Sequence, residues 1–209
     1  MADILTTYPA RLDIDYPDRN LDRLTTFFRL FTIIPIAIIV GLISSGFNWA
    51  DRAGGCSWEY AASGLVFLPV VLMLLFRQKY PRWWFDWNLA LTKFATRVSA
   101  YFALLRDEYP STDEEQAVHI DISYPDAKKL NRWLPLIKWF LAIPHYIILW
   151  FLYIAVIVAV IIAWFAILFT GRYPRGLFDF VVGVFRWSLR VNAYVLLLTT
   201  DRYPPFSTI

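Results

Sequence analysis

The segment IDYPD at Ile14–Asp18 returns later in the chain as ISYPD at Ile122–Asp126. Working outward from these two segments, two further patterns occur twice: YPRxxFD at Tyr80–Asp86 and Tyr173–Asp179, and RVxAY at Arg97–Tyr101 and Arg190–Tyr194. A sequence repeated at this spacing predicts a fold built from two similar units. We therefore divide the chain into repeat 1, residues 1–110, and repeat 2, residues 111–209.

The composition predicts an integral membrane protein. Hydrophobic residues make up 58% of the 209 residues and aromatic residues 19%, and the mean hydropathy is +0.48. This apolar share exceeds that of ordinary soluble domains. The first 20 residues lack a basic region followed by an apolar core, so we expect insertion by an internal segment rather than a cleavable signal peptide. The formal charge of +3 does not indicate a nucleic-acid surface.

Repeat 1 contains two apolar segments of membrane-spanning length. We expect transmembrane helices over about 24–43 and 58–76, because about 20 apolar residues cross a bilayer. A polar loop that contains the single cysteine, Cys56, lies between them. A lone cysteine excludes an intrachain disulfide and a Cys-rich metal site.

Repeat 2 is apolar almost without interruption from Trp133 to Phe169, which is too long for one crossing. The offset between the repeats falls from 109 residues (Pro35 to Pro144) to 93 (Tyr80 to Tyr173). This decrease in the offset is about the length of the polar loop of repeat 1. We therefore predict two spans, about 131–150 and 153–170, joined by a very short turn.

The distribution of cations supports this hairpin. Of the 20 Lys and Arg residues, only Arg52 falls in a far-side loop. By the positive-inside rule the other side, which holds both termini, is the cytoplasm. One long helix in repeat 2 would place five arginines outside: Arg172, Arg175, Arg186, Arg190 and Arg202. The prediction is a multi-pass protein of the cytoplasmic membrane, mainly α-helical, with two parallel repeats.

An amphipathic helix is expected after each hairpin, over about 83–105 and 177–198. The cations Lys93 and Arg97, and likewise Arg186 and Arg190, are four residues apart, a spacing that places both on one helix face. We predict helices in the cytoplasmic interface whose cations bind anionic lipid headgroups. The alternative is a third span in each repeat, with the arginines buried in the membrane.

Period-two alternation over 12–16 and 120–124 predicts two short half-buried strands. They pair either with each other or with the segments ending in Tyr109-Pro110 and Tyr203-Pro204, forming a small cytoplasmic sheet. Seven of the twelve prolines follow tyrosine, a pattern typical of corners at the membrane surface with the phenol hydroxyl in water. The acidic segment Arg106–Gln116 is interpreted as a solvated linker.

Arg29 and Lys138 occupy corresponding positions in the first span of each repeat. Such side chains either extend to the lipid phosphates or line a cytoplasmic vestibule. Thr25, Thr26 and Thr32, together with Arg29, are the plausible polar lining of a pore.

No sequence pattern of a common nucleotide, hydrolase, metalloprotease or thiol site is present, so we predict a protein that is not an enzyme and has no cofactor or metal. His145 is interpreted as a hydrogen-bonded helix residue, with haem or metal ligation as the alternative. The residues Asp13, Asp15, His119 and Asp121 are interpreted as solvent-facing strand positions, with a divalent-cation site as the alternative.

Three motifs together closely resemble a family of prokaryotic membrane proteins whose domain has no known function: YPxRLDIDYP at Tyr8–Pro17, WFxILFTGRYP at Trp164–Pro174 and RVxAY at Arg190–Tyr194. The likeness covers nearly the whole chain. Repeat 1 departs from it in its long far-side loop and in Gln78-Lys79, where repeat 2 has Thr-Gly-Arg. The resemblance implies a multi-span bacterial or archaeal membrane protein and supplies no activity or ligand.

We expect a scaffold or accessory subunit that binds anionic lipids and partner membrane proteins. The alternative is a homo-oligomeric ion channel lined by the first span, because four mostly apolar spans cannot enclose a water path alone. The sparse polarity within the spans favours the scaffold.

Overall fold

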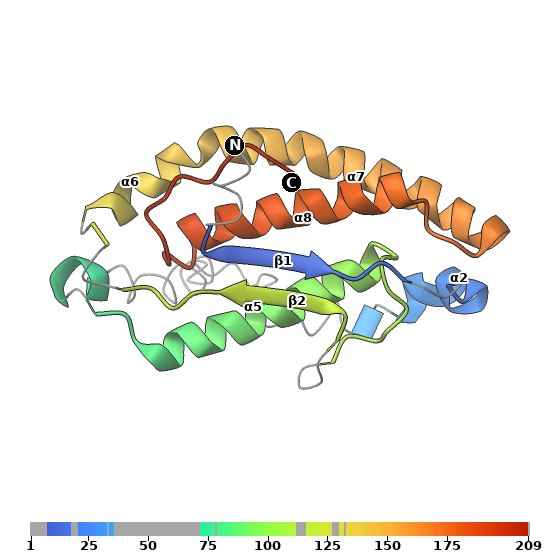
Figure 1. Ribbon diagram of the computed structural model, residues 1–209, viewed down its shortest axis with the longest axis horizontal. Helices are drawn as coiled ribbons and strands as arrows, with labels where there is room; N and C mark the ends of the chain where they lie inside the picture. Colours follow the sequence, from blue (N-terminus) through green and yellow to red (C-terminus); the bar gives the residue numbers. More distant parts are fainter. Residues whose placement is uncertain are drawn as a thin grey trace, which may run out of the picture.

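The computed structural model describes residues 8–17, 21–32, 34–35, 72–77, 79–111, 116–126, 130–131 and 133–208. Within this part of the chain, Figure 1 shows a two-stranded sheet flanked by helices that run along the long axis of the molecule. The elements are β1 (Ala10–Ile14), α2 (Arg23–Thr32), the short π-helix η1 (Met73–Arg77), α5 (Arg82–Phe102), β2 (Val118–Ile122), α6 (Leu134–Leu141), α7 (Ile143–Thr170) and α8 (Arg175–Val195).

The sheet consists of β1 and β2, which pair antiparallel with Leu12 opposite Ile120. Both strands alternate strictly between buried and exposed residues, because successive side chains of a strand point to opposite faces. This confirms the two predicted strands, each of which lies two residues earlier than the predicted 12–16 and 120–124, and of the two predicted pairings it is the pairing with each other that occurs.

Each strand packs on the helix from the other half of the chain. Helix α8 lies along β1, and α5 lies along β2 (Figure 1). Arg186 Nε on α8 donates to the carbonyl oxygen of Leu12 at 2.9 Å, and the Tyr8 hydroxyl donates to the carbonyl oxygen of Arg190 at 3.3 Å. Helix α7 covers the side of α8 that faces away from β1. The most buried helix, α8, is thus shared between the sheet and α7.

The Tyr-Pro corners also join the two halves. The Tyr16 hydroxyl donates to the carbonyl oxygen of Tyr173, and the Tyr124 hydroxyl donates to that of Tyr80. The prediction that such tyrosines lie at the membrane surface with wet hydroxyls is wrong for Tyr80 and Tyr173, whose rings are buried in the protein. Burial raises the pKa of both phenols above the ordinary value, so both stay protonated.

The long apolar run of the second half forms α6 and α7, which are separated at Ala142. The predicted spans 131–150 and 153–170 with a turn between them are therefore wrong, because α7 is one continuous helix through that position. Pro144 lies in the first turn of α7, where a missing N–H breaks no hydrogen bond. No further glycine or proline occurs before Gly171, which ends the helix with a left-handed φ of 73°.

Among the described residues, α7 is the one helix long and apolar enough to cross a membrane. The predicted span 24–43 begins as α2 and the predicted span 58–76 ends in η1. Apart from residues 34–35 and 72, which are helical, the rest of both spans and the loop that contains Arg52 and Cys56 lie outside the described residues. The predicted helices 83–105 and 177–198 exist as α5 and α8 with shifted ends.

The first prediction concerns the crossing of α8 and the C-terminal segment. A Cβ atom on Gly183, in the middle of α8, would lie 2.5 Å from the carbonyl oxygen of Thr208. We expect Gly183→Ala to lower the free energy of unfolding by about 1–3 kcal/mol, the cost of overpacking, and to expose the C-terminal segment to protease. Gly176→Ala is the matched control on the same helix, because a Cβ there has nothing within 4 Å. Equal melting temperatures for the two variants in detergent would contradict this packing.

Candidate functional site

Two buried cations other than Arg190 lie in clusters at the two ends of the molecule. One cluster joins α2 to the loop after α5, and the other joins α6 to the loop after α8 (Figure 1). We call the first cluster, which contains Arg29, Tyr101 and Asp107, the Arg29 clamp. We call the second, which contains Lys138, Tyr194 and Asp201, the Lys138 clamp. The described residues contain no group of three or more His, Cys, Asp or Glu side chains placed to hold a metal ion.

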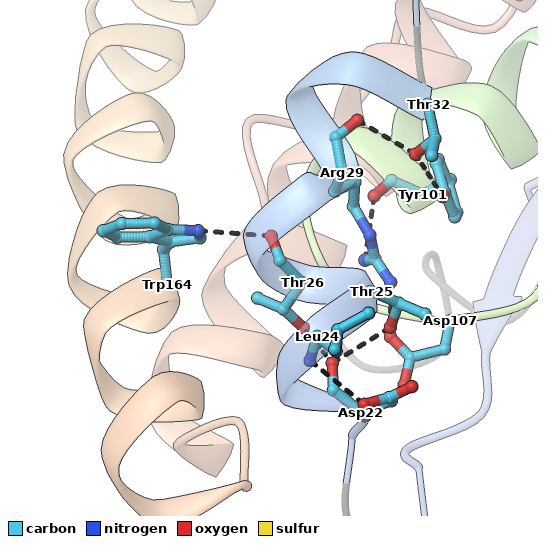
Figure 2. A network of polar contacts seen from close by, with 9 residues as sticks. All are labelled: Asp22, Leu24, Thr25, Thr26, Arg29, Thr32, Tyr101, Asp107 and Trp164. Carbon is cyan, nitrogen blue, oxygen red and sulfur yellow. Dashed lines mark hydrogen bonds and ion pairs between the residues drawn. The ribbon is translucent and has the colours of Figure 1, made fainter.

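The Arg29 clamp holds an arginine whose side chain is only 4% exposed. Arg29 forms an ion pair with Asp107 and donates from Nη1 to the carbonyl oxygen of Tyr101 at 3.2 Å. Its guanidinium also lies over the Tyr101 ring, 4.3 Å from the centroid. Figure 2 shows this network and its link to α7, where the indole N–H of Trp164 donates to the carbonyl oxygen of Thr26 at 3.3 Å.

The Lys138 clamp has the same parts. The fully buried Lys138 ammonium lies 2.8 Å from Asp201 Oδ1 and donates to the carbonyl oxygen of Thr200 at 2.7 Å. It also lies 4.9 Å from the centroid of the Tyr194 ring. One carboxylate, one carbonyl and one aromatic ring therefore replace the water that each buried cation has lost.

The second oxygen of each carboxylate binds the chain just before the helix that carries the cation. Asp107 Oδ2 accepts from the backbone N–H of Asp22 at 2.9 Å, and Asp201 Oδ2 accepts from that of Asn131 at 2.6 Å. The side chains of Asp22 and Asn131 in turn accept from the backbone N–H two residues later, at 3.0 and 3.1 Å. The Asp22 contact satisfies a free donor at the start of α2, whereas the Asn131 contact orders the segment just before α6.

The loops that supply the carboxylates turn through a leucine with positive φ, Leu104 at 63° and Leu198 at 53°. A bulky residue in the left-handed region is strained by about 1–3 kcal/mol, and glycine is the usual residue after a helix. Both leucine side chains are buried. We infer that burial of the leucine side chain offsets the strain and directs the loop back toward the clamp.

These contacts correct the predicted vestibule. Arg29 and Lys138 neither line a cavity nor extend to lipid phosphates, because their charges are paired inside the protein. Of the residues predicted to line a pore, Thr25 and Thr32 are exposed, and their hydroxyls donate to carbonyl oxygens of the preceding turn, Asp22 at 3.0 Å and Arg29 at 3.1 Å.

The four cations predicted to bind headgroups turn largely toward the protein. Arg190 is buried, and Arg186 bonds to β1 through Leu12 and lies 3.6 Å from Asp13. Arg97 donates to the carbonyl oxygen of Ser111 at 2.7 Å, while Lys93 is half-buried. The spacing of four does place each pair on one face, but the face with Arg186 and Arg190 packs against β1 and the C-terminal segment.

The outer face of the sheet carries the charges of β1 and β2. His119 Nε2 lies 3.3 Å from Asp15 Oδ2, and both side chains are more than half exposed. Exposed pairs of this kind contribute about 0–1 kcal/mol to stability. This agrees with the interpretation of Asp13, Asp15, His119 and Asp121 as solvent-facing strand positions.

His145 is a buried, hydrogen-bonded helix residue, as predicted. The indole N–H of Trp187 donates to His145 Nδ1 at 3.2 Å, and the Phe206 ring stacks on the imidazole with centroids 4.1 Å apart. The histidine thus joins the start of α7 to α8 and the C-terminal segment.

Helix α7 exposes most of its surface. Its buried residues follow one face, namely His145, Leu149, Val156, Ala159, Ala163 and Ile167. The most apolar 18 residues of the helix are only 22% buried. Between Lys138 and Arg172 the chain has no Asp, Glu, Lys or Arg. The outward surface of α7, which we call the apolar face, is therefore a continuous hydrocarbon surface.

These features define a mainly helical protein with one helix of membrane-spanning length and a small two-stranded sheet. Residues 133–208 match the model of a domain of unknown function, DUF4389. The matched part comprises α6, α7, α8 and the C-terminal segment, and includes Lys138, Tyr194 and Asp201. No curated protein and no solved structure matches the chain.

Sequence reasoning missed the partners of the two cations. Asp107 was assigned to a solvated linker, but its side chain is only 15% exposed. A signal was available, because the RVxAY pattern carries both tyrosines and an aspartate follows each one six or seven residues later, Asp107 after Tyr101 and Asp201 after Tyr194.

The second prediction tests the Lys138 clamp. We expect Asp201→Asn to lower the free energy of unfolding by about 3–5 kcal/mol, because it leaves a buried ammonium without its carboxylate. Adding Lys138→Met should recover much of the loss by removing the unpaired charge. Asp13→Asn is the matched control, since its side chain is 77% exposed and its loss should cost at most about 1 kcal/mol. Similar unfolding midpoints for Asp201→Asn and Asp13→Asn in detergent would contradict a structural role for the clamp.

Proposed function

We propose that this chain is a non-enzymatic integral membrane protein that acts as a scaffold or accessory subunit. It binds lipids through the apolar face and binds a partner membrane protein through its charged sheet. The observation that carries the proposal is the apolar face of α7, because soluble monomers rarely expose an apolar surface of this extent.

The charge distribution supports a division of roles between two surfaces. Exposed charges lie on the outer face of the sheet, where the strand pairing fixes their spacing. The apolar face of α7 lies on the other side of α8 from this sheet. A surface of acidic side chains with Arg11 and His119 among them, on two paired strands, suits recognition of a complementary polar surface.

We propose that anionic headgroups meet exposed arginines at the end of α7 instead of the inward-facing Arg190. Arg172 and Arg175 are exposed there, next to the last turn of the helix. Cations near a membrane surface attract anionic lipids by about 1 kcal/mol each.

We also propose that the chain is a duplicated module of a prokaryotic membrane family, placed as a multi-pass protein in the cytoplasmic membrane with both termini in the cytoplasm. The paired clamps support duplication, since Arg29 and Lys138, Tyr101 and Tyr194, and Asp107 and Asp201 play corresponding roles. The positive-inside rule supports the cytoplasmic termini with α7 not crossing the membrane, because a single crossing by α7 would place Arg172 and the arginines after it on the far side.

The channel alternative loses the two cations of its proposed lining, because Arg29 and Lys138 are paired inside the protein. The third prediction follows from this. Purified protein reconstituted in planar bilayers should give no ion current, since a conducting path needs polar groups or a wetted constriction. Discrete single-channel events that change with Arg29→Gln would overturn the scaffold and favour the channel.

The scaffold itself is tested by a photo-crosslinking amino acid placed in living cells at Asp121 on the sheet or at Ile157 on α7. Asp121 is exposed, and Ile157 is 58% exposed. We expect a protein adduct of one reproducible mass from Asp121, lost on charge reversal at Asp13 and Asp15, and lipid adducts from Ile157. Adducts only between copies of the chain at both positions would contradict the accessory role.

A further inference from the structure

We infer that α7 lies parallel to the membrane plane, submerged in one leaflet, with the hydrocarbon of that leaflet covering its apolar face. This inference rests on the proposed membrane function and specifies how the lipid is bound. It follows from the contacts between α7 and α8 and from the position of the sheet on α8.

Helix α7 packs along α8 and bonds to it at its start and near its middle. His145 accepts from Trp187 at the start, and the Tyr153 hydroxyl lies 2.8 Å from Ser188 Oγ further along. Figure 1 shows the two helices side by side over nearly the whole length of α8. A membrane position for α7 therefore determines the position of α8.

The sheet packs on α8 next to the residues of α8 that contact the middle of α7. Arg186, two residues from Ser188, bonds to the Leu12 carbonyl oxygen and to Asp13. Ser188 contacts Tyr153, which lies near the middle of α7. The charged outer face of the sheet thus lies beside the centre of α7, about two layers of packed elements away.

A crossing orientation would place this sheet inside the bilayer. Helix α7 has 28 residues and is about 42 Å long at the standard rise. If it crossed the membrane, its middle would lie at the centre of the hydrocarbon core, which is about 30 Å thick. The Asp13 and Asp15 side chains, 77% and 56% exposed, would then lie at the depth of the lipid tails. Charges at that depth are strongly disfavoured, and an open two-stranded sheet leaves backbone groups that lipid cannot hydrogen-bond.

The parallel orientation removes both conflicts. A helix is about 10 Å across with its side chains, and one leaflet provides about 15 Å of hydrocarbon, half of the core. Helix α8 then separates α7 from the sheet, and the sheet faces water. Large apolar residues are exposed along all of α7, among them Ile147, Ile154, Ile161 and Phe169, as a helix lying lengthwise in lipid requires.

Depth measurements along α7 test the inference. In a full-length Cys56→Ser background, single cysteines replace Ile147, Ile154 and Ile161, which are 55%, 45% and 51% exposed and share a face. A fluorophore on each is quenched in vesicles by lipids brominated at defined depths. Asp121→Cys, on the exposed face of β2, is the aqueous reference. Circular dichroism and melting temperature confirm that each variant is folded.

We expect equal quenching depths at the three α7 positions, within one leaflet, and access of water-soluble quenchers to Asp121→Cys. A depth about 10 Å greater at Ile154 than at Ile147 would overturn the parallel orientation while leaving the membrane function intact. Absence of lipid quenching at all three positions in protein that stays in the membrane would overturn lipid as the covering group and indicate a second chain. Failure of the protein to float with vesicles would overturn the proposed membrane function itself.

Discussion

The buried ammonium of Lys138 is the constraint on which the second half of the structure depends. Removing an ammonium from water costs several kcal/mol unless its hydrogen bonds and charge are matched. Here the match requires Asp201, the Thr200 carbonyl and the Tyr194 ring at once. These groups come from the end of α8 and the loop beyond it, whereas the lysine is on α6. A conformation that separates α6 from this loop is therefore excluded by charge as well as by packing, and Arg29 imposes the same condition on α2 and the loop after α5.

The sequence alone predicted the elements whose signal is local. Alternation at Leu12 and Ile14, and at Ile120 and Ile122, predicted β1 and β2, because one strand face is buried wherever helices cover it. The turn predicted between 150 and 153 failed for a physical reason. The aromatic residues there are common at membrane interfaces, but an aromatic residue does not end a helix. Without glycine or proline, hydrogen bonding continues from turn to turn, and packing on α8 reinforces it.

The clamps were not predictable from local pattern, because their members are far apart in sequence. Arg29 and Asp107 are separated by 78 residues, and Asp107 lies in a run of acidic residues that resembles a solvated linker. Arg29 and Lys138 are unusual in the sequence because each is a cation within an apolar segment. Asp107 and Asp201 have charged neighbours, so the sequence around them gives no such indication. A buried ion pair is a property of two segments together, so the composition of either one is insufficient to reveal it.

Because each strand packs on a helix from the other half of the chain, the order of synthesis affects how the protein folds. Leu12 of β1 and its partner Arg186 of α8 are 174 residues apart, so at about 5–20 residues per second β1 exists for roughly 10–35 s before α8 is made. During that time its apolar face lacks α8, and the edge that pairs with β2 stays open until β2 has been made; an uncovered strand edge readily pairs with other chains. The part of the molecule synthesised first is thus the part completed last, and its protection in the cell depends on the membrane-insertion machinery, a chaperone or slow folding rather than on native contacts.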